Sequence, residues 1–302
     1  GGHRHLNKEP LDTSQIARDV SGILPINPVL PTLIALQETT QIWRGNNYSS
    51  DGELLAQQLG DRYRFMFAPE VDSAIHAHST IWARSIYQGY GRAQNGNGIV
   101  TNLPSARWAW SIPTEGYPGA SGAQAIHTTI SHARLYSTGN RDTQPRNLIM
   151  TCVESPFGAL YFMSTHLSTL RGEERRNPYH PISQQASSER LFECEQILTL
   201  TGELRMAERE ANIKPRPIIL AADFNAEAET RELQILQPTF TLLKPAPSPQ
   251  GTHINHKINI DHILIADPAK KLPPVQQCFV NTASEVANVT DHHPVVAILG
   301  NL

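Results

Sequence analysis

The apolar run from Pro217 to Ala222, which ends in Asp223-Phe224-Asn225, constrains the fold more than any other stretch of the chain. Five consecutive apolar residues behind a proline-containing segment predict a short strand that is buried on both faces. Side chains two residues apart lie on one side of a strand, so we expect the Asp223 carboxylate and the Asn225 amide to meet at its carboxyl end. If other strands also end in polar groups, this edge of the sheet is a functional site.

The composition predicts a soluble globular protein with a substantial core. The chain has 302 residues, of which 39% are hydrophobic, and this length fits one large domain or two small ones. A formal net charge of −3 and a pI near 6.5 give no overall basic field. Tight binding to a nucleic-acid backbone is therefore not indicated, although a local basic loop is compatible with these values.

Cysteine usage and hydropathy argue against two further classes of protein. Cys152, Cys194 and Cys278 are far apart and form no Cys-x-x-Cys motif, so we interpret them as packing residues and not as disulfide or zinc-binding residues. No stretch predicts a membrane span, because prolines interrupt the nearest candidate, Ile23–Leu36. The chain begins with Gly1-Gly2 and not with methionine, so we expect an upstream part, and the compartment, cytoplasmic or secreted, stays open.

Two more predicted strands end in a polar side chain. Leu33–Gln37 predicts a short buried strand, and Glu38 follows it directly. A carboxylate at this place is a candidate ligand for a hard metal ion, although Glu38 alone is better explained as a solvent-exposed strand end. A predicted hairpin of Asn147–Val153 and Ala159–Ser164 leads to His166, which alone is best explained as a structural histidine.

The C-terminal part adds two carboxylates and a histidine. Ile258–Ile265 alternates as a half-buried strand, which places Asp261 on a face shared with apolar side chains. A buried carboxylate needs a partner, so we expect one for Asp261. Asp291 and His292 stand immediately before the last predicted strand, Pro294–Leu299.

The remaining segments predict helices and polar loops. We expect helices from about Asp12 to Val20, Asp51 to Leu59, Ser188 to Ala211 and Thr230 to Leu236. The charged segment Arg171–Ser187 predicts a surface loop, and its arginines are candidates for phosphate contact because they follow His166. We interpret His76 and His78 as exposed loop residues, although a His-x-His pair can bind a metal ion.

Each of these signals is weak alone, but their order along the chain is specific. The ordered set consists of polar residues at strand ends: Glu38, His166, Asp223, Asn225, Asp261, Asp291 and His292. This set resembles the endonuclease/exonuclease/phosphatase superfamily, and the resemblance covers the chain from Gly1 to Leu299. Asn95–Thr101 and Pro145–Leu148 also resemble segments of that family, less specifically.

The resemblance implies a fold and a role for each motif. The fold is a four-layer α/β sandwich, in which two mixed β-sheets pack face to face with helices outside, and residues 1–302 form one domain. Glu38 would bind the essential Mg²⁺, for which Mn²⁺ is a possible substitute, and Asp291 would be a further metal-facing carboxylate. The other implied site residues are the catalytic His166, Asp223, Asn225, Asp261 and His292, and the substrate-binding Asn97, Arg146 and Arg171.

The chemistry of phosphate-ester hydrolysis independently requires these residue types. Phosphoryl transfer to water needs a hard cation, an oriented nucleophile and donors for the growing negative charge. Oxygen ligands suit Mg²⁺ or Mn²⁺. A buried carboxylate such as Asp261 would fix the tautomer of His292 and favour its protonated form. Together with the resemblance, these residues predict a Mg²⁺-dependent phosphoesterase, which hydrolyses a phosphodiester or phosphomonoester by direct attack of water. We expect it to be a monomer.

The substrate class stays open, whereas the motifs argue against two other families of phosphoesterase. The substrate is a lipid or small-molecule phosphoester, or a nucleic acid, which would make the protein an endo- or exonuclease. Asp291-His292-His293 also spells the signature of the DHH phosphoesterases, but those need an early Asp-x-Asp and a long domain after the motif. Calcineurin-like metallophosphatases need Asp-x-His and Gly-Asn-His-Glu segments, which do not occur. A non-catalytic binding protein on the same fold would normally have lost the catalytic residues.

The start of the chain departs from the family pattern. Family members begin with a strand that ends in Asn-Ile-x-x-Gly-Gly or a similar segment, and its asparagine completes the metal site. This chain starts at what resembles that Gly-Gly. We expect the first strand to lie upstream, because the loss of a buried strand would exceed the marginal stability of a folded domain.

Overall fold

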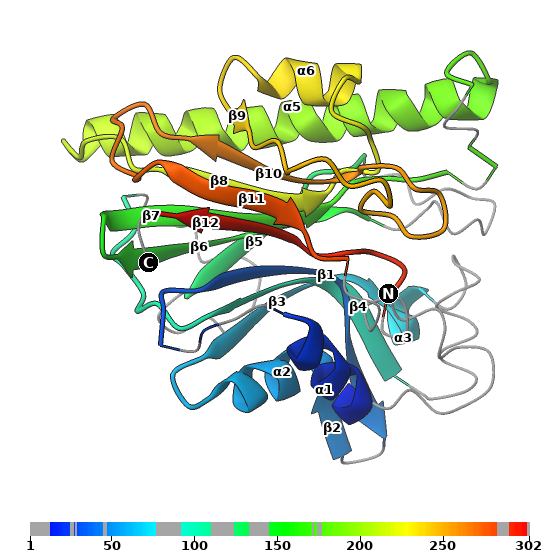
Figure 1. Ribbon diagram of the computed structural model, residues 1–302, viewed down its shortest axis with the longest axis horizontal. Helices are drawn as coiled ribbons and strands as arrows, with labels where there is room; N and C mark the ends of the chain where they lie inside the picture. The colour runs from blue at the N-terminus through cyan, green and yellow to red at the C-terminus, as the bar shows by residue number, and fades with distance from the viewer. Residues whose placement is uncertain are drawn as a thin grey trace.

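The computed structural model describes residues 13–24, 27, 29–44, 47–76, 92–109, 124–132, 145–170, 172–173, 177–282 and 290–300. Helices α5 (Pro181–Glu210) and α6 (Arg231–Leu236) cover one side of a six-stranded sheet (Figure 1). A four-stranded sheet lies on its other side, and α1 (Thr13–Ile23) and α2 (Asp51–Leu59) cover that sheet from outside. This arrangement is the four-layer α/β sandwich that the sequence predicts.

The six-stranded sheet contains the apolar run that ends at Asp223. Its strands, in spatial order, are β5 (Ala125–Thr129), β6 (Asn147–Ser155), β7 (Gly158–His166), β8 (Ile218–Asp223), β10 (Asp261–Ala266) and β9 (Thr241–Leu242). The β7–β8 pair is parallel and the other described pairs are antiparallel. The chain can return in parallel because the long helix α5 crosses between the two strands.

The smaller sheet is antiparallel throughout its described strands. Its spatial order is β2 (Asn47–Ser50), β1 (Leu33–Arg44), β4 (Arg92–Thr101) and β3 (Arg64–Asp72), and the short α3 (Ser73–His76) follows β3. Strands β11 (Val275–Val280) and β12 (Val295–Leu299) form a separate two-stranded ribbon. The sequence predicts two mixed sheets, but only the six-stranded sheet is mixed within the described residues. In the smaller sheet, every described pair of strands is antiparallel.

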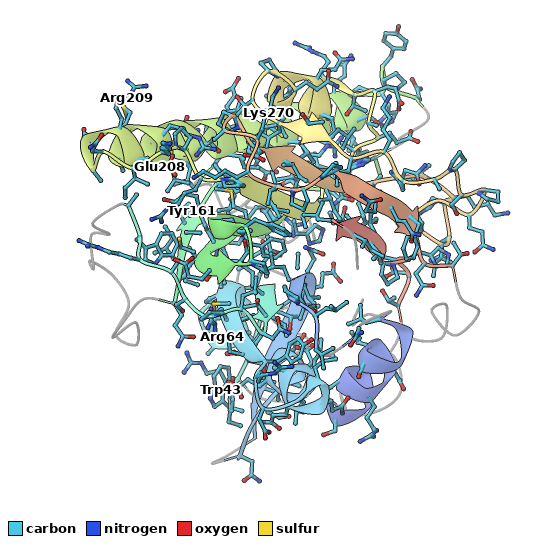
Figure 2. The ribbon with its side chains drawn as sticks, turned by 60° about the vertical axis from the view of Figure 1, so that its left-hand side comes forward. Trp43, Arg64, Tyr161, Glu208, Arg209 and Lys270 are labelled. Carbon is cyan, nitrogen blue, oxygen red and sulfur yellow. The ribbon has the colours of Figure 1, made fainter. Side chains whose placement is uncertain are left out.

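Strand β8 is buried on both faces, as its apolar run predicts. Ile218 and Leu220 belong to the core cluster under α5, which includes Ile197 and Leu204. Ile219 belongs instead to the cluster between the two sheets. Figure 2 shows the buried Tyr161 inside the molecule, whereas Arg209 projects from the outer side of α5.

Several boundaries differ from the sequence expectations, each for a local reason. Helix α5 begins at Pro181 and not near Ser188, because a proline fits the first turn of a helix. Strand β1 continues past Glu38 to Arg44, because the chain forms a bulge at Glu38 and does not turn away. No helix among the described residues is long and apolar enough to cross a membrane.

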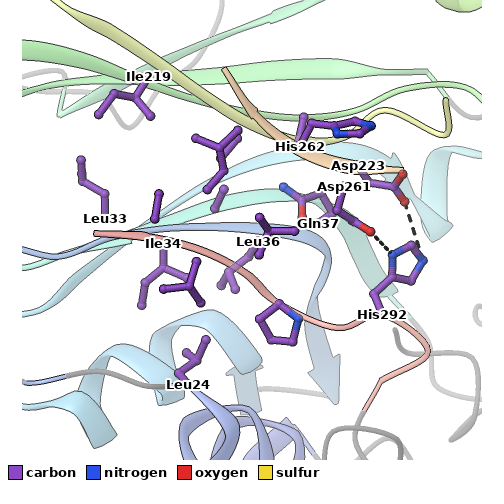
Figure 3. Close-up of a pocket in the computed structure, with 18 of the residues that line it drawn as sticks. Leu24, Leu33, Ile34, Leu36, Gln37, Ile219, Asp223, Asp261, His262 and His292 are labelled. Carbon is purple, nitrogen blue, oxygen red and sulfur yellow. Dashed lines mark hydrogen bonds and ion pairs between the residues drawn. The ribbon is translucent and has the colours of Figure 1, made fainter. Parts of the chain in front are cut away.

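A cavity of about 1880 Å³ lies between the layers and reaches the end of β8 (Figure 3). Apolar side chains of β1, β8, β10 and β12 line most of it, and polar residues stand at one end. Within the described part of the chain, Leu33–Leu36 pairs only with β4, and β12 pairs only with β11. The cavity therefore borders two strand edges without a described partner, and the expected additional strand stays a prediction.

Candidate active site

The candidate site forms where three strands of the larger sheet bring polar residues to one edge. Parallel pairing of β7 with β8 places His166 beside Asp223. Antiparallel pairing of β10 with β8 places Asp261 on the other side of Asp223. The backbone register alone therefore gathers three of the predicted catalytic residues, because the strand ends meet at the same edge.

His292 joins this group from the segment that precedes β12. Its Nδ1 lies 2.8 Å from Asp261 Oδ2, and its Nε2 lies 3.8 Å from Asp223 Oδ2 (Figure 3). His166 Nε2 approaches the same Asp223 oxygen at 3.5 Å. One carboxylate oxygen of Asp223 thus stands between two imidazoles, and Asp261 has the partner that a buried carboxylate requires.

Asn225 supports Asp223 through the turn that ends β8. Its backbone N–H donates to Asp223 Oδ1 at 2.8 Å, and its side-chain Nδ2 donates to the Leu167 carbonyl at 2.9 Å. Its φ is 49°, a left-handed conformation that asparagine adopts more readily than most residues. The backbone N–H of Asn225 therefore contacts the carboxylate, and Asn225 lies in a turn and not in the strand. The predicted contact of its side-chain amide with Asp223 stays a prediction.

His166 is held as a neutral imidazole. Burial lowers its pKa, and the positive charge of Arg146 lowers that pKa further, to well below the usual value. Arg146 Nη1 lies 3.1 Å from His166 Nδ1, and a guanidinium can only donate. Nδ1 therefore accepts, and the ring proton of His166 resides on Nε2, which faces Asp223.

His292 is in the opposite charge state. Burial alone would lower its pKa, but the charge of Asp261, its hydrogen bond and the charge of Asp223 together raise the pKa of His292 to about 10. The same ion pair lowers the pKa of Asp261, although burial acts in the other direction. At neutral pH, a neutral and a cationic imidazole therefore flank the Asp223 carboxylate.

The two predicted metal ligands line the same end of the cavity. Glu38 lies at the β-bulge where the register of β1 against β4 shifts, with a φ of 54°, and it is half-buried. Its negative charge raises the pKa of His166, against the larger effects of burial and Arg146, so it is near that imidazole. Asp291 is also half-buried and precedes His292. Two such carboxylates fit Mg²⁺, which proteins often hold with one or two carboxylates while several waters remain bound.

The predicted substrate-binding residues have protein partners in this structure. Asn97 is buried in β4, and its Nδ2 donates to Glu70 Oε1 and to the Asn147 carbonyl, both at 2.8 Å. Arg146 is buried as well and donates to Glu70 Oε2 at 3.2 Å, in addition to its contact with His166. Arg171 lies outside the described residues. Substrate contact by these three residues stays a prediction.

Two residues that support the site were not predicted from the sequence. Glu70 is buried within β3, where it receives both Arg146 and Asn97, and burial raises its pKa to about 7 against the effect of Arg146. Thr252 Oγ1 accepts the Asp261 N–H at 3.1 Å and so fixes the start of β10. A lone carboxylate inside an apolar strand was the signal for Glu70, and it is the same signal that marks Asp261.

Solved structures with a similar fold are known for this chain, although no protein-family model and no curated protein matches its sequence. An endonuclease/exonuclease/phosphatase from Beutenbergia cavernae has a similar structure, with a TM-score of 0.56 and 16% identity over 96% of this chain and 66% of its own. An endonuclease/exonuclease/phosphatase family protein from Leptotrichia buccalis has a TM-score of 0.56 and 16% identity, over 100% of this chain and 97% of its own. The chain has the endonuclease/exonuclease/phosphatase fold.

A third structure agrees with this assignment. An endonuclease/exonuclease/phosphatase from Bacteroides vulgatus has a TM-score of 0.52 and 12% identity, over 95% of this chain and 90% of its own. At such low sequence identity, structural similarity establishes the shared fold alone. Within this endonuclease/exonuclease/phosphatase fold, the site residues must be judged by their own geometry.

Proposed function

We propose that the protein is a Mg²⁺-dependent phosphoesterase, which hydrolyses a phosphodiester or phosphomonoester by direct attack of water. The observation that carries the proposal is the placement of Asp223 between the neutral His166 and the cationic His292. A carboxylate beside two N–H donors provides a base for water and donors for phosphate oxygens in one place.

Asp223 orients the attacking water and accepts its proton. The Asn225 N–H donates to one oxygen of Asp223 and fixes the carboxylate, while its other oxygen faces the histidines. The two imidazoles lie 3.5 Å and 3.8 Å from that oxygen, which is longer than a strong hydrogen bond. Both N–H groups are therefore able to turn to phosphate oxygens when the substrate lies between them.

His292 and His166 stabilise the negative charge that grows on the phosphate. His292 acts as a cation, because Asp261 holds its Nδ1–H and keeps its Nε2–H available. His166 acts as a neutral donor of fixed tautomer, because Arg146 holds its Nδ1. Glu38 and Asp291 would hold Mg²⁺, which supplies positive charge to the non-bridging phosphate oxygens.

The substrate class rests on weaker observations than the chemistry. A net charge of −3 favours a lipid or small-molecule phosphoester over duplex DNA. An endo- or exonuclease is the alternative, because the family of the similar structures is named after nucleases and phosphatases alike. A non-catalytic binding protein on this fold is the second alternative, and the presence of Asp223, His166 and His292 at one place argues against it.

Metal-dependent hydrolysis of bis-p-nitrophenyl phosphate tests the proposal. We expect turnover with Mg²⁺ or Mn²⁺ and none with EDTA. Glu38→Gln should lower kcat/KM at least about a hundredfold and raise the Mg²⁺ concentration required, because a charged ligand is lost. The exposed Glu227→Gln is the matched control and should retain activity. Turnover that is indifferent to EDTA and to Glu38→Gln would reject the proposal.

A substrate panel separates the alternatives. Plasmid DNA, single-stranded RNA, sphingomyelin and inositol phosphates would each be incubated with Mg²⁺ and with EDTA. Cleavage of DNA or RNA alone supports the nuclease, and cleavage of either of the others supports the favoured substrate class. No turnover on any substrate, together with no Mg²⁺ bound at excess Mg²⁺, supports the binding protein.

A further inference from the structure

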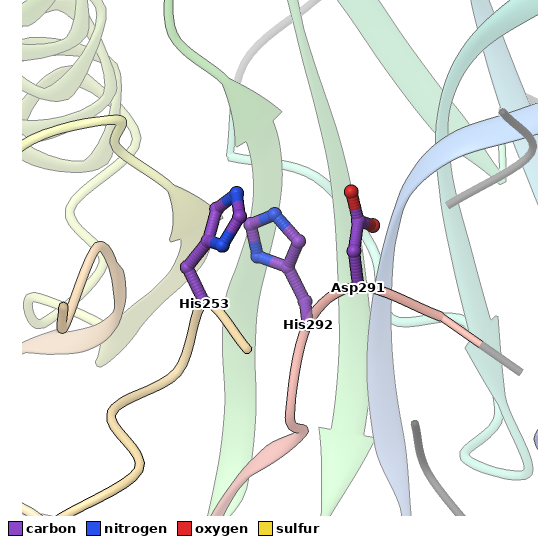
Figure 4. A group of neighbouring side chains, drawn as sticks. All are labelled: His253, Asp291 and His292. Atoms are coloured by element: carbon purple, nitrogen blue, oxygen red, sulfur yellow. The ribbon is translucent and has the colours of Figure 1, made fainter. Parts of the chain in front are cut away.

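Three side chains that can ligate a metal ion gather at the candidate site, and one of them, His253, has no role in the proposed hydrolysis. His253 comes from the loop between β9 and β10, and Asp291 and His292 precede β12. One ligand atom from each lies within 4.8 Å of the others (Figure 4). The close-up shows the side chains projecting to the same side of the backbone that carries them.

Backbone hydrogen bonds hold the two segments together on both sides of His253. His253 and His292 form an antiparallel β-bridge. The N–H of His293 donates to the Thr252 carbonyl at 2.7 Å, and the N–H of Ile254 donates to the Asp291 carbonyl at 2.8 Å. The imidazole centroids of His253 and His292 lie 4.8 Å apart. The backbone hydrogen bonds therefore hold together the two segments that carry the three side chains.

The environment of His292 is typical of a histidine that binds a metal ion. Asp261 Oδ2 lies 2.8 Å from its Nδ1, which leaves Nε2 as the ligand atom. Metal-ligating histidines usually donate their second ring N–H to a carboxylate or carbonyl in this way, and the partner orients the ring and makes the ligand more basic. Asp261 provides that partner here.

We propose that His253, Asp291 and His292 Nε2 form a binding site for a borderline transition-metal ion, with Zn²⁺ as the representative ion. Two imidazoles and one carboxylate suit Zn²⁺, Co²⁺ or Ni²⁺, whereas Mg²⁺ prefers oxygen ligands alone. His253 is the residue that makes this ligand set different from the predicted Mg²⁺ site at Glu38 and Asp291. The site therefore selects for a different class of cation.

Occupancy of this site inhibits the hydrolysis, a consequence that rests on the proposed function. A metal ion binds the lone pair of Nε2, so any proton on that nitrogen is released to solvent when the ion binds. His292 then has no N–H to offer a phosphate oxygen. The ion also occupies Asp291, which the proposed Mg²⁺ site uses.

Co²⁺ absorption tests the site without reference to activity. The protein, freed of metal by EDTA and exchanged into excess Mg²⁺, would be titrated with Co²⁺ and followed by its visible d–d bands. We expect one bound Co²⁺ per chain, and binding at least about tenfold weaker in His253→Gln. The control is His256→Gln, because this exposed histidine contacts the His253 ring but is outside the ligand group, and it should bind as the wild type does.

The variant His253→Phe keeps an aromatic ring at this position without a ligand nitrogen and controls for packing. It should also lose Co²⁺ binding, with a thermal midpoint close to that of the wild type. Absence of a d–d band in the wild type would overturn the proposal. Equal Co²⁺ affinity in the wild type, His253→Gln and His253→Phe would overturn it as well.

Inhibition by Zn²⁺ tests the consequence. At saturating Mg²⁺, hydrolysis by the wild type and by His256→Gln should be inhibited, and His253→Gln should need at least about tenfold more Zn²⁺. Equal inhibition of all three would contradict the inhibitory role. If no variant hydrolyses any phosphoester, the proposed function fails, and the Co²⁺ titration still decides the metal site.

Discussion

At the scale of single residues, the two histidines beside Asp223 differ in charge because their second nitrogens face opposite partners. His166 Nδ1 faces the Arg146 guanidinium, and His292 Nδ1 faces the Asp261 carboxylate. The same side chain is therefore a neutral donor on one side of the site and a cationic donor on the other. Neither state follows from the sequence around the histidine, because both partners come from other strands.

The raised pKa of His292 predicts how stability depends on pH in the metal-free protein. Its folded value of about 10 lies above the ordinary value of 6.5, so the folded state binds this proton more tightly. The contribution of His292 protonation to the free energy of unfolding is complete below about pH 6.5 and is lost as the pH rises towards about 10. We expect the difference in unfolding free energy between wild type and His292→Gln to shrink over this range, measured by urea unfolding in EDTA.

A difference that stays constant from pH 6 to pH 10, roughly the interval between the two pKa values, would contradict this account of His292. Gln is the appropriate replacement because it can still donate to Asp261 and cannot titrate. Groups distant from His292 titrate equally in both proteins, so they cancel in the comparison.

At the scale of elements, helix α5 fixes the loop that follows His166. Arg190 donates to both oxygens of Glu173, at 3.1 Å and 2.8 Å, to Glu232 at 3.1 Å and to the Ser168 carbonyl at 3.1 Å. Glu193, whose pKa burial raises to about 7, accepts the Ser168 N–H at 2.8 Å. This loop also carries the Leu167 carbonyl that holds Asn225.

Removal of the buried guanidinium should therefore destabilise the protein strongly. Arg190→Met leaves Glu173 and Glu232 buried without their cation, and we expect a loss of about 3 to 5 kcal/mol in the free energy of unfolding. Arg209→Met is the matched control, because Arg209 is exposed at the last turn of the same helix (Figure 2). Urea unfolding of both variants measures the effect, and equal stabilities would show that the buried network contributes nothing.

Strand ends were predictable from the sequence, and strand neighbours were not. An apolar run that stops at a polar residue marked β7 and β8, so His166 and Asp223 were found. Periodicity gives the faces of a strand but not its partner, so the contact of Glu70 with Arg146 was missed. His253 was missed for the same reason, since its bridge to His292 joins two distant loops.

At the scale of the whole molecule, the order of weak motifs predicted the fold better than any one of them. Glu38, His166, Asp223 and Asp261 stand on four different strands or strand ends, and only the sandwich brings them to one edge. The position of the helix start at Pro181 and the length of β1 needed the structure, because both depend on tertiary packing.

Two strand edges that border the cavity between the layers should be open to hydrogen exchange in residues 1–302. The edge of β1 at Leu33–Leu36 and the edge of β12 away from β11 both border it. We expect the backbone amides that point to these edges to exchange with solvent much faster than those of β8, because unpaired amides are not protected. Hydrogen exchange followed by NMR measures this. Equal protection would show that the edges are already paired and would remove the case for an additional strand.

We propose that Asp223, between two imidazoles, activates water for attack on a phosphate ester. The most direct test is the rate of Mg²⁺-dependent bis-p-nitrophenyl phosphate hydrolysis by Asp223→Asn, with the exposed Asp61→Asn as its control. We expect a loss of at least about a thousandfold in kcat/KM for Asp223→Asn, a cooperative unfolding transition that shows the variant is folded, and wild-type activity for Asp61→Asn. Activity of Asp223→Asn within about tenfold of the wild type would contradict the account.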